Sequence, residues 1–453
     1  MKFSKLSQLF LVSSIGLLVA TVFSACAITT IDYVFVANST GTGTSNDGQI
    51  ETYAADSQSG ALRTAGSAVS SGGVNPVAMA VTSDYENLYV ANSGSNNIAH
   101  FHINISGTLT AADTLTLTGA APIRMAVNSA GTYLYVISCT PSATQTCTAG
   151  SAALTEYGLS SGTIGAAVAS VPLNLSNVSA GIYAGDDIVP TGITVLANNS
   201  DVTGNAVFVS AYDVTAYNPG GTTGPCPPIG CANSGWVFGF AIGSGGTLTA
   251  STSGNPAITV SPWEAGVKPS AIASDPTNRF VYITDFAQSQ LIGYTIIDGS
   301  VLSFLPSGPF KTGNEPTAVI IDPRGMFIYV TNSLDSTVSP YEITLATGVP
   351  TGAVNATGSG NNSTDTEPVA IVMDPALGRF VYTANYLGNS ISGFIANPTS
   401  GALAVTQATP YPRGKTDRDR VCSPRQLLHA IGYTVTAASS ADKKAQPGHG
   451  WAS

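Results

Sequence analysis

A stretch of eighteen residues recurs along the chain, and this repetition limits the possible folds more than any other feature. Residues 315–332 read EPTAVIIDPRGMFIYVTN, in which two apolar runs enclose a short polar break. Two such runs around a break with turn residues predict a hairpin of two strands. Further copies occupy residues 75–92, 121–138, 268–285 and 367–385, with a degenerate copy at 190–211 and a half copy at 32–38.

A second pattern follows each copy, and together the two patterns predict the architecture. An apolar segment with one aromatic residue comes first, and a glycine-centred turn follows it. The seven aromatic residues are Tyr53, Phe101, Tyr157, Phe240, Tyr294, Tyr341 and Phe394. Each unit therefore reads as four short strands, A to D, and equivalent tyrosines lie as close as 46 residues apart, at Tyr89 and Tyr135.

Four-stranded units with a period of about 40–50 residues are typical of β-propellers. We therefore predict an all-β fold, a seven-bladed β-propeller of four-stranded antiparallel blades, over residues 32–412. The alternative is a β-solenoid, whose repeat is normally shorter. Because each blade covers the faces of its two neighbours, repetition of the unit allows the blades to close into a ring. The repeat by itself predicts no catalytic or binding activity.

Closure of this ring depends on the end of the chain. The first unit has no A strand, so the C-terminal segment is expected to supply one. Residues 413–453 form a basic tail in which only residues 424–431 weakly follow the strand A pattern. We predict a possible ring-closing strand there and disorder in the rest of the tail; the alternative is a tail foreign to the fold.

Charge excludes one class of function. Only 9% of the residues are charged, and residues 27–412 contain 7 Lys and Arg against 23 Asp and Glu. Nucleic-acid binding depends on neutralising phosphates, so an acidic body argues against nucleic acid as a partner. No cofactor is expected, and the predicted ring is taken to be a monomer.

The N-terminus resembles an export signal. Lys2 and Lys5 precede an apolar run that ends in small residues before Cys26. This order is typical of a secretory signal, and a cysteine in that place resembles a bacterial lipobox. We predict a lipoprotein signal peptide at residues 1–25, lipidation of Cys26 and a linker at 26–31. The protein would then be an exported outer-membrane lipoprotein, facing the periplasm or the surface; a plain N-terminal membrane anchor is the alternative.

Cysteine spacing agrees with export. Cys139 and Cys147 lie in one loop-like stretch, and Cys226 and Cys231 lie in another. Two local disulfides are the expected arrangement in an exported protein. A zinc site is disfavoured because neither pair is a CxxC and no histidine is near, so no metal is predicted. Cys422 remains without an expected partner.

The repeated Pro-x-Ala, Asp-Pro and Tyr-Val-Thr-Asn elements resemble the YVTN-type and lactonase-type seven-bladed propellers, which include 6-phosphogluconolactonases. The resemblance covers about residues 31–412 and implies the fold. Such lactonases often have a histidine just after the strand A proline. Here those positions are Val77, Ile123, Thr191, Ser270, Thr317 and Val369. No catalytic residue is therefore carried over from the family.

Candidate binding residues come from the loops and from one exception in the repeat. The long insertions at 139–152, 165–189, 212–234 and 249–267 are expected on one face of blades 3 and 4. Arg124 stands where other repeats have Ala or Gly, and its guanidinium suits a carboxylate or phosphate. An ion pair with Asp186 or Asp187 is the alternative. Aromatic and acidic contacts are expected from Trp236, Trp263 and Glu264, for which loop packing is the alternative.

These observations predict a binding scaffold for a small anionic ligand or an envelope protein, anchored to the membrane by its N-terminal lipid. The alternative is a lactone hydrolase, in which Arg124 holds an anionic substituent and an acidic loop residue acts as general base. A third possibility is an adhesive surface protein without a pocket. His100 and His102 lie in strand C, where packing is favoured over catalysis or metal binding.

Overall fold

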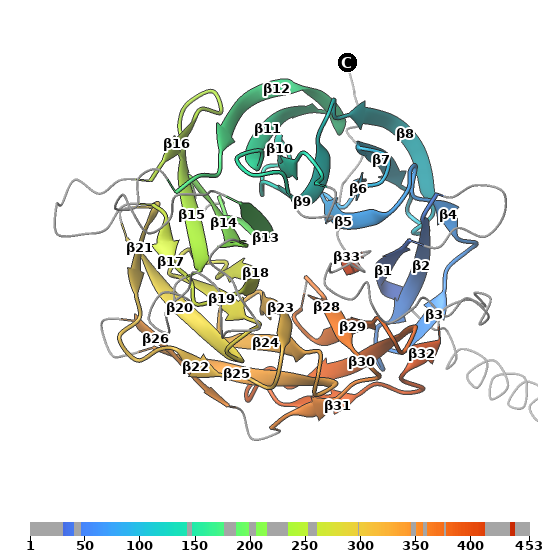
Figure 1. Ribbon diagram of the computed structural model, residues 1–453. Helices are drawn as coiled ribbons and strands as arrows, with labels where there is room; N and C mark the ends of the chain where they lie inside the picture. The colour runs from blue at the N-terminus through green and yellow to red at the C-terminus, as the bar shows by residue number, and fades with distance from the viewer. Residues whose placement is uncertain are drawn as a thin grey trace, which may run out of the picture.

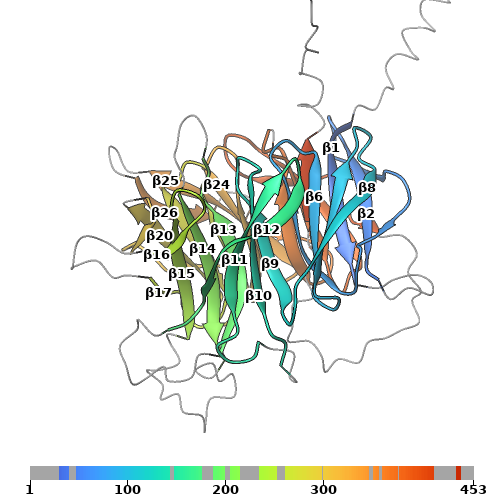
Figure 2. The same cartoon turned by 90° about the horizontal axis from the view of Figure 1, so that it is seen from above.

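The computed structural model describes most of the repeat region. The described residues are 30–39, 47–142, 147–175, 187–198, 205–214, 234–251, 261–297, 299–345, 350–356, 360–375, 377–412 and 435–439. Within them the chain forms seven antiparallel sheets arranged as the blades of a propeller, without a helix (Figure 1). Figure 2 shows the disc edge-on, with the strands running from one face to the other. The predicted seven-bladed fold is confirmed.

The strands of each blade follow one another from the centre outward. Blade 2 contains β5 (Pro76–Val81), β6 (Asn87–Asn92), β7 (Asn97–Ile103) and β8 (Leu109–Thr116). Blade 3 contains β9 (Ala121–Val127), β10 (Tyr133–Cys139), β11 (Ala153–Ser160) and β12 (Thr163–Pro172). The stretch 165–189, expected as a connection, is thus partly strand, because β12 continues to Pro172.

In blades 4 to 7 the outermost strand is divided into two pieces that pair with the same third strand. Blade 4 has β13 (Ile188–Val195), β14 (Ala206–Asp213), β15 (Gly235–Ile242), β16 (Leu248–Ala250) and β17 (Trp263–Glu264). Blade 5 has β18 (Pro269–Ser274), β19 (Phe280–Asp285), β20 (Gln290–Ile297), β21 (Val301–Phe304) and β22 (Phe310–Lys311). Blade 6 has β23 (Pro316–Ile321), β24 (Phe327–Asn332), β25 (Thr337–Leu345), β26 (Pro350–Ala356) and β27 (Asn362–Ser363). Blade 7 has β28 (Pro368–Met373), β29 (Phe380–Asn385), β30 (Ser390–Ala396), β31 (Leu403–Val405) and β32 (Tyr411–Pro412).

Blade 1 joins the two ends of the chain. It contains β1 (Thr30–Asn38), β2 (Gln49–Asp56), β3 (Leu62–Thr64) and β4 (Val69–Ser70). The inner strand of this blade is β33 (Val435–Ser439), which pairs antiparallel with β1 from Asp32 to Val36. The C-terminal segment therefore supplies the missing strand, at a later position than residues 424–431, which lie outside the described residues.

The Pro-x-small motif of strand A marks a β-bulge. In blade 6 the pairing of β23 with β24 shifts between Pro316 and Ala318, so Thr317 is the extra residue. Equivalent shifts occur at the strand A prolines of blades 2, 4, 5 and 7. Proline lacks a backbone N–H, so it is tolerated where a ladder is interrupted. The repeat thus encodes a bulge at the inner edge of each of these sheets.

The polar break between strands A and B is held by its aspartate. In blade 6 the Asp322 carboxylate accepts hydrogen bonds from the backbone N–H of Met326 at 2.6 Å and of Phe327 at 2.8 Å. Side-chain acceptors of this kind replace the ladder bonds that a tight turn cannot make. The Asp-Pro-Arg-Gly sequence therefore closes the hairpin.

The hydrophobic cores lie between the blades. Val34 and Tyr53 of blade 1 pack with Phe380 and Tyr382 of blade 7 in one buried cluster. The Tyr382 hydroxyl donates a 2.7 Å hydrogen bond to the carbonyl of Gly60 in the next blade. Gly60 has φ +66°, and a Cβ there would lie 2.3 Å from the Phe380 ring. Both the repeated tyrosine and the turn glycine thus fasten neighbouring blades together.

Candidate functional site

The antiparallel order of the strands separates two faces of the disc. The turns between strands B and C and the entries into strand A lie on one face, and the A–B and C–D turns lie on the other. The A strands β5, β9, β13, β18, β23, β28 and β33 surround the centre of the ring (Figure 1). Residues that directly precede the strand A prolines therefore lie near the axis on the first face.

Four of these residues occupy equivalent positions. Each carbonyl accepts a hydrogen bond from the first residue after strand B, at 2.7 to 2.9 Å. The pairs, donor first, are Ser93 with Asn75, Phe286 with Lys268, Ser333 with Glu315, and Tyr386 with Glu367. We call Asn75, Lys268, Glu315 and Glu367 the axial rim. Three of them have left-handed backbones, with φ of 58° at Asn75, 53° at Glu315 and 59° at Glu367.

The axial rim carries a row of interacting charges on consecutive blades. Burial lowers the pKa of the Lys268 ammonium, and the negative charge of Glu315 opposes this shift. Burial and the neighbouring Glu315 charge both raise the pKa of Glu367. The Lys268 ammonium lies 4.9 Å from the centre of the Phe286 ring and 5.6 Å from that of Tyr212. A half-buried carboxyl whose pKa is raised by burial and by a second carboxyl is a candidate for proton transfer.

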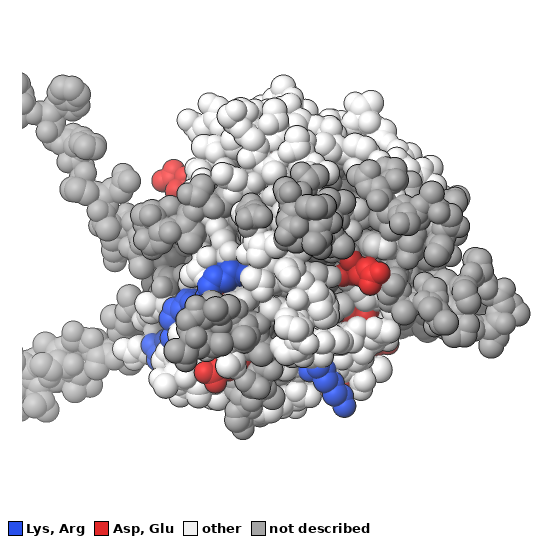
Figure 3. Space-filling view, turned by 90° about the vertical axis from the view of Figure 1, so that its left-hand side faces the viewer, with Lys and Arg blue, Asp and Glu red and all other residues white. Residues whose placement is uncertain are grey.

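These charges stand out because the protein has few. Figure 3 shows the side of the disc that carries β16 and β21, where uncharged residues form most of the described surface. Left-handed backbone at a residue other than glycine is uncommon and is found preferentially at functional sites. Glu315 and Glu367 of the axial rim combine a charged side chain with a left-handed backbone.

Arg124 lies on strand β9, as its sequence predicts, and it contacts the main chain. Its Nε donates to the carbonyl of Thr191 in blade 4 at 2.9 Å, and its Nη1 donates to the carbonyl of Ile123 at 2.9 Å. Burial lowers the pKa of Arg124. No ion pair joins it to a carboxylate in the described part of the chain. The guanidinium therefore connects blades 3 and 4.

The acidic candidates of the neighbouring loop are only partly described. Asp187 is half-buried next to β13, and burial raises the pKa of its carboxyl. One of its carboxylate oxygens, Oδ1, is buried and has no hydrogen-bond partner among the described residues. Asp186 lies outside the described residues. The alternative of an ion pair between Arg124 and Asp187 is not observed, and the one with Asp186 stays a prediction.

The remaining candidates of blade 4 belong to its sheet. Trp236 lies in β15 and Trp263 in β17, and their side chains are 2% and 4% exposed within hydrophobic cores. Glu264 is exposed, and its main-chain carbonyl accepts the hydroxyl of Tyr294. Trp263 was expected in the insertion 249–267 and Trp236 beside the insertion 212–234, but the outer strand resumes after residue 260 and buries Trp263. Their burial favours packing over ligand contact.

The cysteine and histidine predictions can be checked in part. Cys139 and Cys147 form the expected disulfide. Cys26, Cys226, Cys231 and Cys422 lie outside the described residues. His100 is 1% exposed, where its ring stacks on Tyr89 and pairs with Asp113, in agreement with a packing role. The described residues contain no group of three or more His, Cys, Asp or Glu side chains able to hold a metal ion. They also contain no helix long and apolar enough to cross a membrane.

Sequence reasoning overlooked the axial rim because it compared the residues after the strand A prolines. The charged residues occur instead at the position that directly precedes each strand A proline. In order along the chain it reads Asn75, Ala121, Val189, Lys268, Glu315 and Glu367. Three charged residues in one repeat column are notable in a chain with 9% charged residues.

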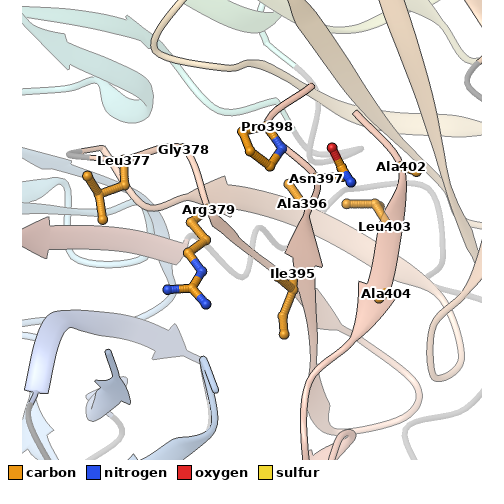
Figure 4. Close-up of a pocket in the computed structure, with 10 residues that line it drawn as sticks. All are labelled: Leu377, Gly378, Arg379, Ile395, Ala396, Asn397, Pro398, Ala402, Leu403 and Ala404. Carbon is orange, nitrogen blue, oxygen red and sulfur yellow. The ribbon is translucent and has the colours of Figure 1, made fainter. Parts of the chain in front are cut away.

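A surface pocket of about 580 Å³ lies on the opposite face, at the A–B and C–D turns of blade 7 (Figure 4). Leu377, Arg379, Ile395, Pro398 and Leu403 contribute to its walls. The Arg379 guanidinium donates to the carbonyls of two residues of blade 1 at 3.0 and 3.3 Å. This pocket is remote from the axial rim, and its arginine serves the junction of the first and last blades.

Solved structures share the fold at low sequence identity. A putative 6-phosphogluconolactonase from Bacteroides fragilis is 14% identical with a TM-score of 0.63, covering 91% of this chain and 99% of its own. A protein from Lactobacillus plantarum is 16% identical with a TM-score of 0.62, covering 90% and 100%. The periplasmic gluconolactonase of Pseudomonas aeruginosa is 18% identical with a TM-score of 0.58, covering 84% and 97%. Identities this low show the fold alone.

The family itself is shown by sequence. None of the curated proteins compared with the chain matches it. The family model described as the lactonase, seven-bladed β-propeller matches residues 70–147 and 243–428, more than half of the chain. The matched residues include Lys268, Glu315 and Glu367 of the axial rim. The chain therefore belongs to the lactonase family of seven-bladed β-propellers.

Proposed function

We propose that the protein hydrolyses a lactone at the axial rim, with Glu367 as the general base. The observation that carries this proposal is the half-buried Glu367 carboxyl, whose pKa is raised by burial and by Glu315. Its side chain makes no hydrogen bond within the described residues, so it is available to accept a proton. Membership of the lactonase family supports the reaction class.

The proposed reaction adds water across the acyl C–O bond of the ring. Ionised Glu367 removes a proton from water while the water oxygen attacks the lactone carbonyl carbon. The candidate cation for stabilising the charge that develops on the carbonyl oxygen is the Lys268 ammonium of blade 5, which is coupled to Glu315 of the rim. The ring C–O bond then breaks, and the proton passes from Glu367 to the leaving alkoxide. The product hydroxy acid ionises and releases one proton to solution.

The binding scaffold expected from the sequence has less support. The blade 3 and 4 loops on which it depended lie partly outside the described residues, and Trp236 and Trp263 are buried. Export to the cell envelope stays part of the proposal. The N-terminal sequence and the Cys139–Cys147 disulfide both agree with an oxidising compartment.

Proton release on a panel of lactones tests the proposal. Glu367→Gln should lower kcat/KM by about 10² or more, the usual contribution of a general base. Glu342→Gln is the matched control, because Glu342 is an exposed carboxyl on β25 of blade 6. Arg124→Ala should keep its turnover per folded molecule. Loss of turnover in Arg124→Ala with an active Glu367→Gln would contradict this assignment, and no turnover on any lactone would refute the hydrolase.

A further inference from the structure

Two exposed leucines lie in the turns next to the axial-rim residues of blades 6 and 7, and the proposed function does not use them. Leu334 and Leu387 are 66% and 61% exposed, among the most exposed large apolar residues of the described chain. Each is the second residue of a four-residue turn between strands B and C. The residue before each leucine, Ser333 or Tyr386, donates its N–H to the carbonyl of the rim glutamate. Each exposed leucine therefore directly follows a residue that is bonded to the main chain of one rim glutamate.

The other blades with this turn lack such a side chain. The equivalent residues are Gly94 in blade 2 and Ala287 in blade 5. The two leucines thus occur only on the two blades that carry the rim glutamates, among the four blades with a defined axial rim. Contact between large apolar side chains and water is unfavourable. A ligand with an apolar part would cover these side chains and remove that contact.

The charges around them disfavour an anionic substrate. Four carboxyl residues lie at this edge of blades 6 and 7, namely Glu315, Asp335, Asp365 and Glu367. Asp335 accepts the N–H of Asn314, and Asp365 accepts the hydroxyl of Ser390. Lys268 of blade 5 is the neighbouring cation at the rim. Arg124 belongs to β9 of blade 3, a strand across the ring from blades 6 and 7 (Figure 1), and its Nε and Nη1 are occupied. A phosphate brought to this edge would meet like charges.

We infer that the substrate is an uncharged lactone with an aliphatic substituent, which lies against Leu334 and Leu387 while the ring carbonyl faces Glu367. This inference rests on the proposed function and adds the substrate class. It differs from the anionic ligand that Arg124 led us to expect from the sequence. The carboxyls provide the proton chemistry and reject phosphorylated lactones, and the leucines select the alkyl group.

The test measures kcat/KM for δ-lactones with methyl, propyl and pentyl substituents and for a phosphorylated sugar lactone. In the wild type we expect kcat/KM to rise about twofold for each added methylene, less than full burial would give. The double variant Leu334→Ser/Leu387→Ser should lose this rise, so that kcat/KM no longer depends on chain length, and it should stay folded because the turns are exposed. Leu377→Ser is the matched control, because Leu377 is 57% exposed on the opposite face.

Binding by calorimetry separates this inference from the proposed function. If no lactone is turned over but affinity rises with chain length in the wild type and not in the double variant, the alkyl site stands and the hydrolase fails. Turnover that is insensitive to chain length, or greatest on the phosphorylated lactone, would overturn the inference and keep the hydrolase. A double variant identical to the wild type would also overturn it.

Discussion

Glu156 offers the most direct test of how burial controls the stability of this ring. It lies on β11 of blade 3, and its side chain is 0% exposed. Neither carboxylate oxygen has a hydrogen-bond partner in the described structure, although the Tyr135 hydroxyl is near enough to lower the pKa slightly. Its neighbour in blade 4 is Gly246, where a Cβ would lie 2.1 Å from Oε1. Burial dominates and raises the pKa of Glu156 to about 7.

The sign of the pH dependence follows from this shift. Below pH 4.5 the carboxyl is protonated in both the folded and unfolded protein, so it contributes no pH-dependent term. As the pH rises from 4.5 toward 7, the unfolded chain releases the proton while the folded chain keeps it, and stability falls. Above pH 7 the carboxyl is ionised in both states, and the free energy of unfolding falls no further through this group. At 1.36 kcal/mol per pKa unit, a shift from 4.5 to about 7 corresponds to about 3 kcal/mol.

Glu156→Gln removes this term while keeping the shape of the protonated side chain. At pH 8 we expect the variant to be more stable than the wild type by up to about 3 kcal/mol, and at pH 4.5 we expect no gain. With about 2 cal/mol/K of unfolding entropy per residue, this difference raises Tm by about 3–4 °C. Thermal unfolding of both proteins at pH 4.5 and pH 8 measures it. An equal change at the two pH values, or a loss of stability at pH 8, would refute the reasoning.

Other perturbations test the axial rim and the junctions between blades. Glu315→Gln removes a charge that raises the pKa of Glu367, so the rise of kcat/KM with pH should move to lower pH; an unshifted profile would contradict the coupling. Gly60→Ala places a Cβ against the Phe380 ring on a backbone with φ +66°, and should cost about 2–4 kcal/mol in urea unfolding. Arg379→Ala loses two exposed hydrogen bonds from blade 7 to blade 1 and should cost only about 1 kcal/mol; a larger loss would mean that this junction limits the whole ring.

The sequence predicted the fold because one motif encodes several independent requirements. In blade 6, Pro316 and Ala318 mark the bulge, Asp322 holds the next turn, and the Phe-Ile-Tyr-Val-Thr-Asn strand is fully buried. The closing strand was less accessible to this reasoning. The segment Val435–Ser439 pairs with β1 through its backbone and carries no Pro-x-small motif. A strand that joins the free edge of a sheet through its backbone can have many different side chains. Its residues therefore form no pattern that predicts the pairing.

The site was harder to predict for physical reasons. Glu315 and Glu367 have a left-handed backbone just before a proline, a conformation that the residue pattern of the repeat does not predict. Trp263 was placed in a loop because the outer strand of blade 4 is interrupted, and pairing of Trp263 with Val237 resumes beyond the interruption. The alternation of apolar and polar residues predicts only continuous strands. When an insertion divides a strand, the short second piece is therefore interpreted as part of a loop.

Arg124 shows why an exception within a repeat does not by itself indicate a ligand site. In blades 5 and 6 the bulged residue fastens strand A to the next blade, since the Ser270 hydroxyl donates to the Pro316 carbonyl at 2.6 Å and Thr317 donates to Pro368 at 2.8 Å. In blade 3 the bulged residue is Ile123, which cannot donate a side-chain hydrogen bond. Arg124, one residue later, bonds to blade 4 through Nε, at the carbonyl of Thr191, one residue after the strand A proline. This exception in the repeat therefore has a structural bond to the next blade, whereas the charged axial-rim residues Glu315 and Glu367 carry the electrostatic coupling on which the proposed function rests.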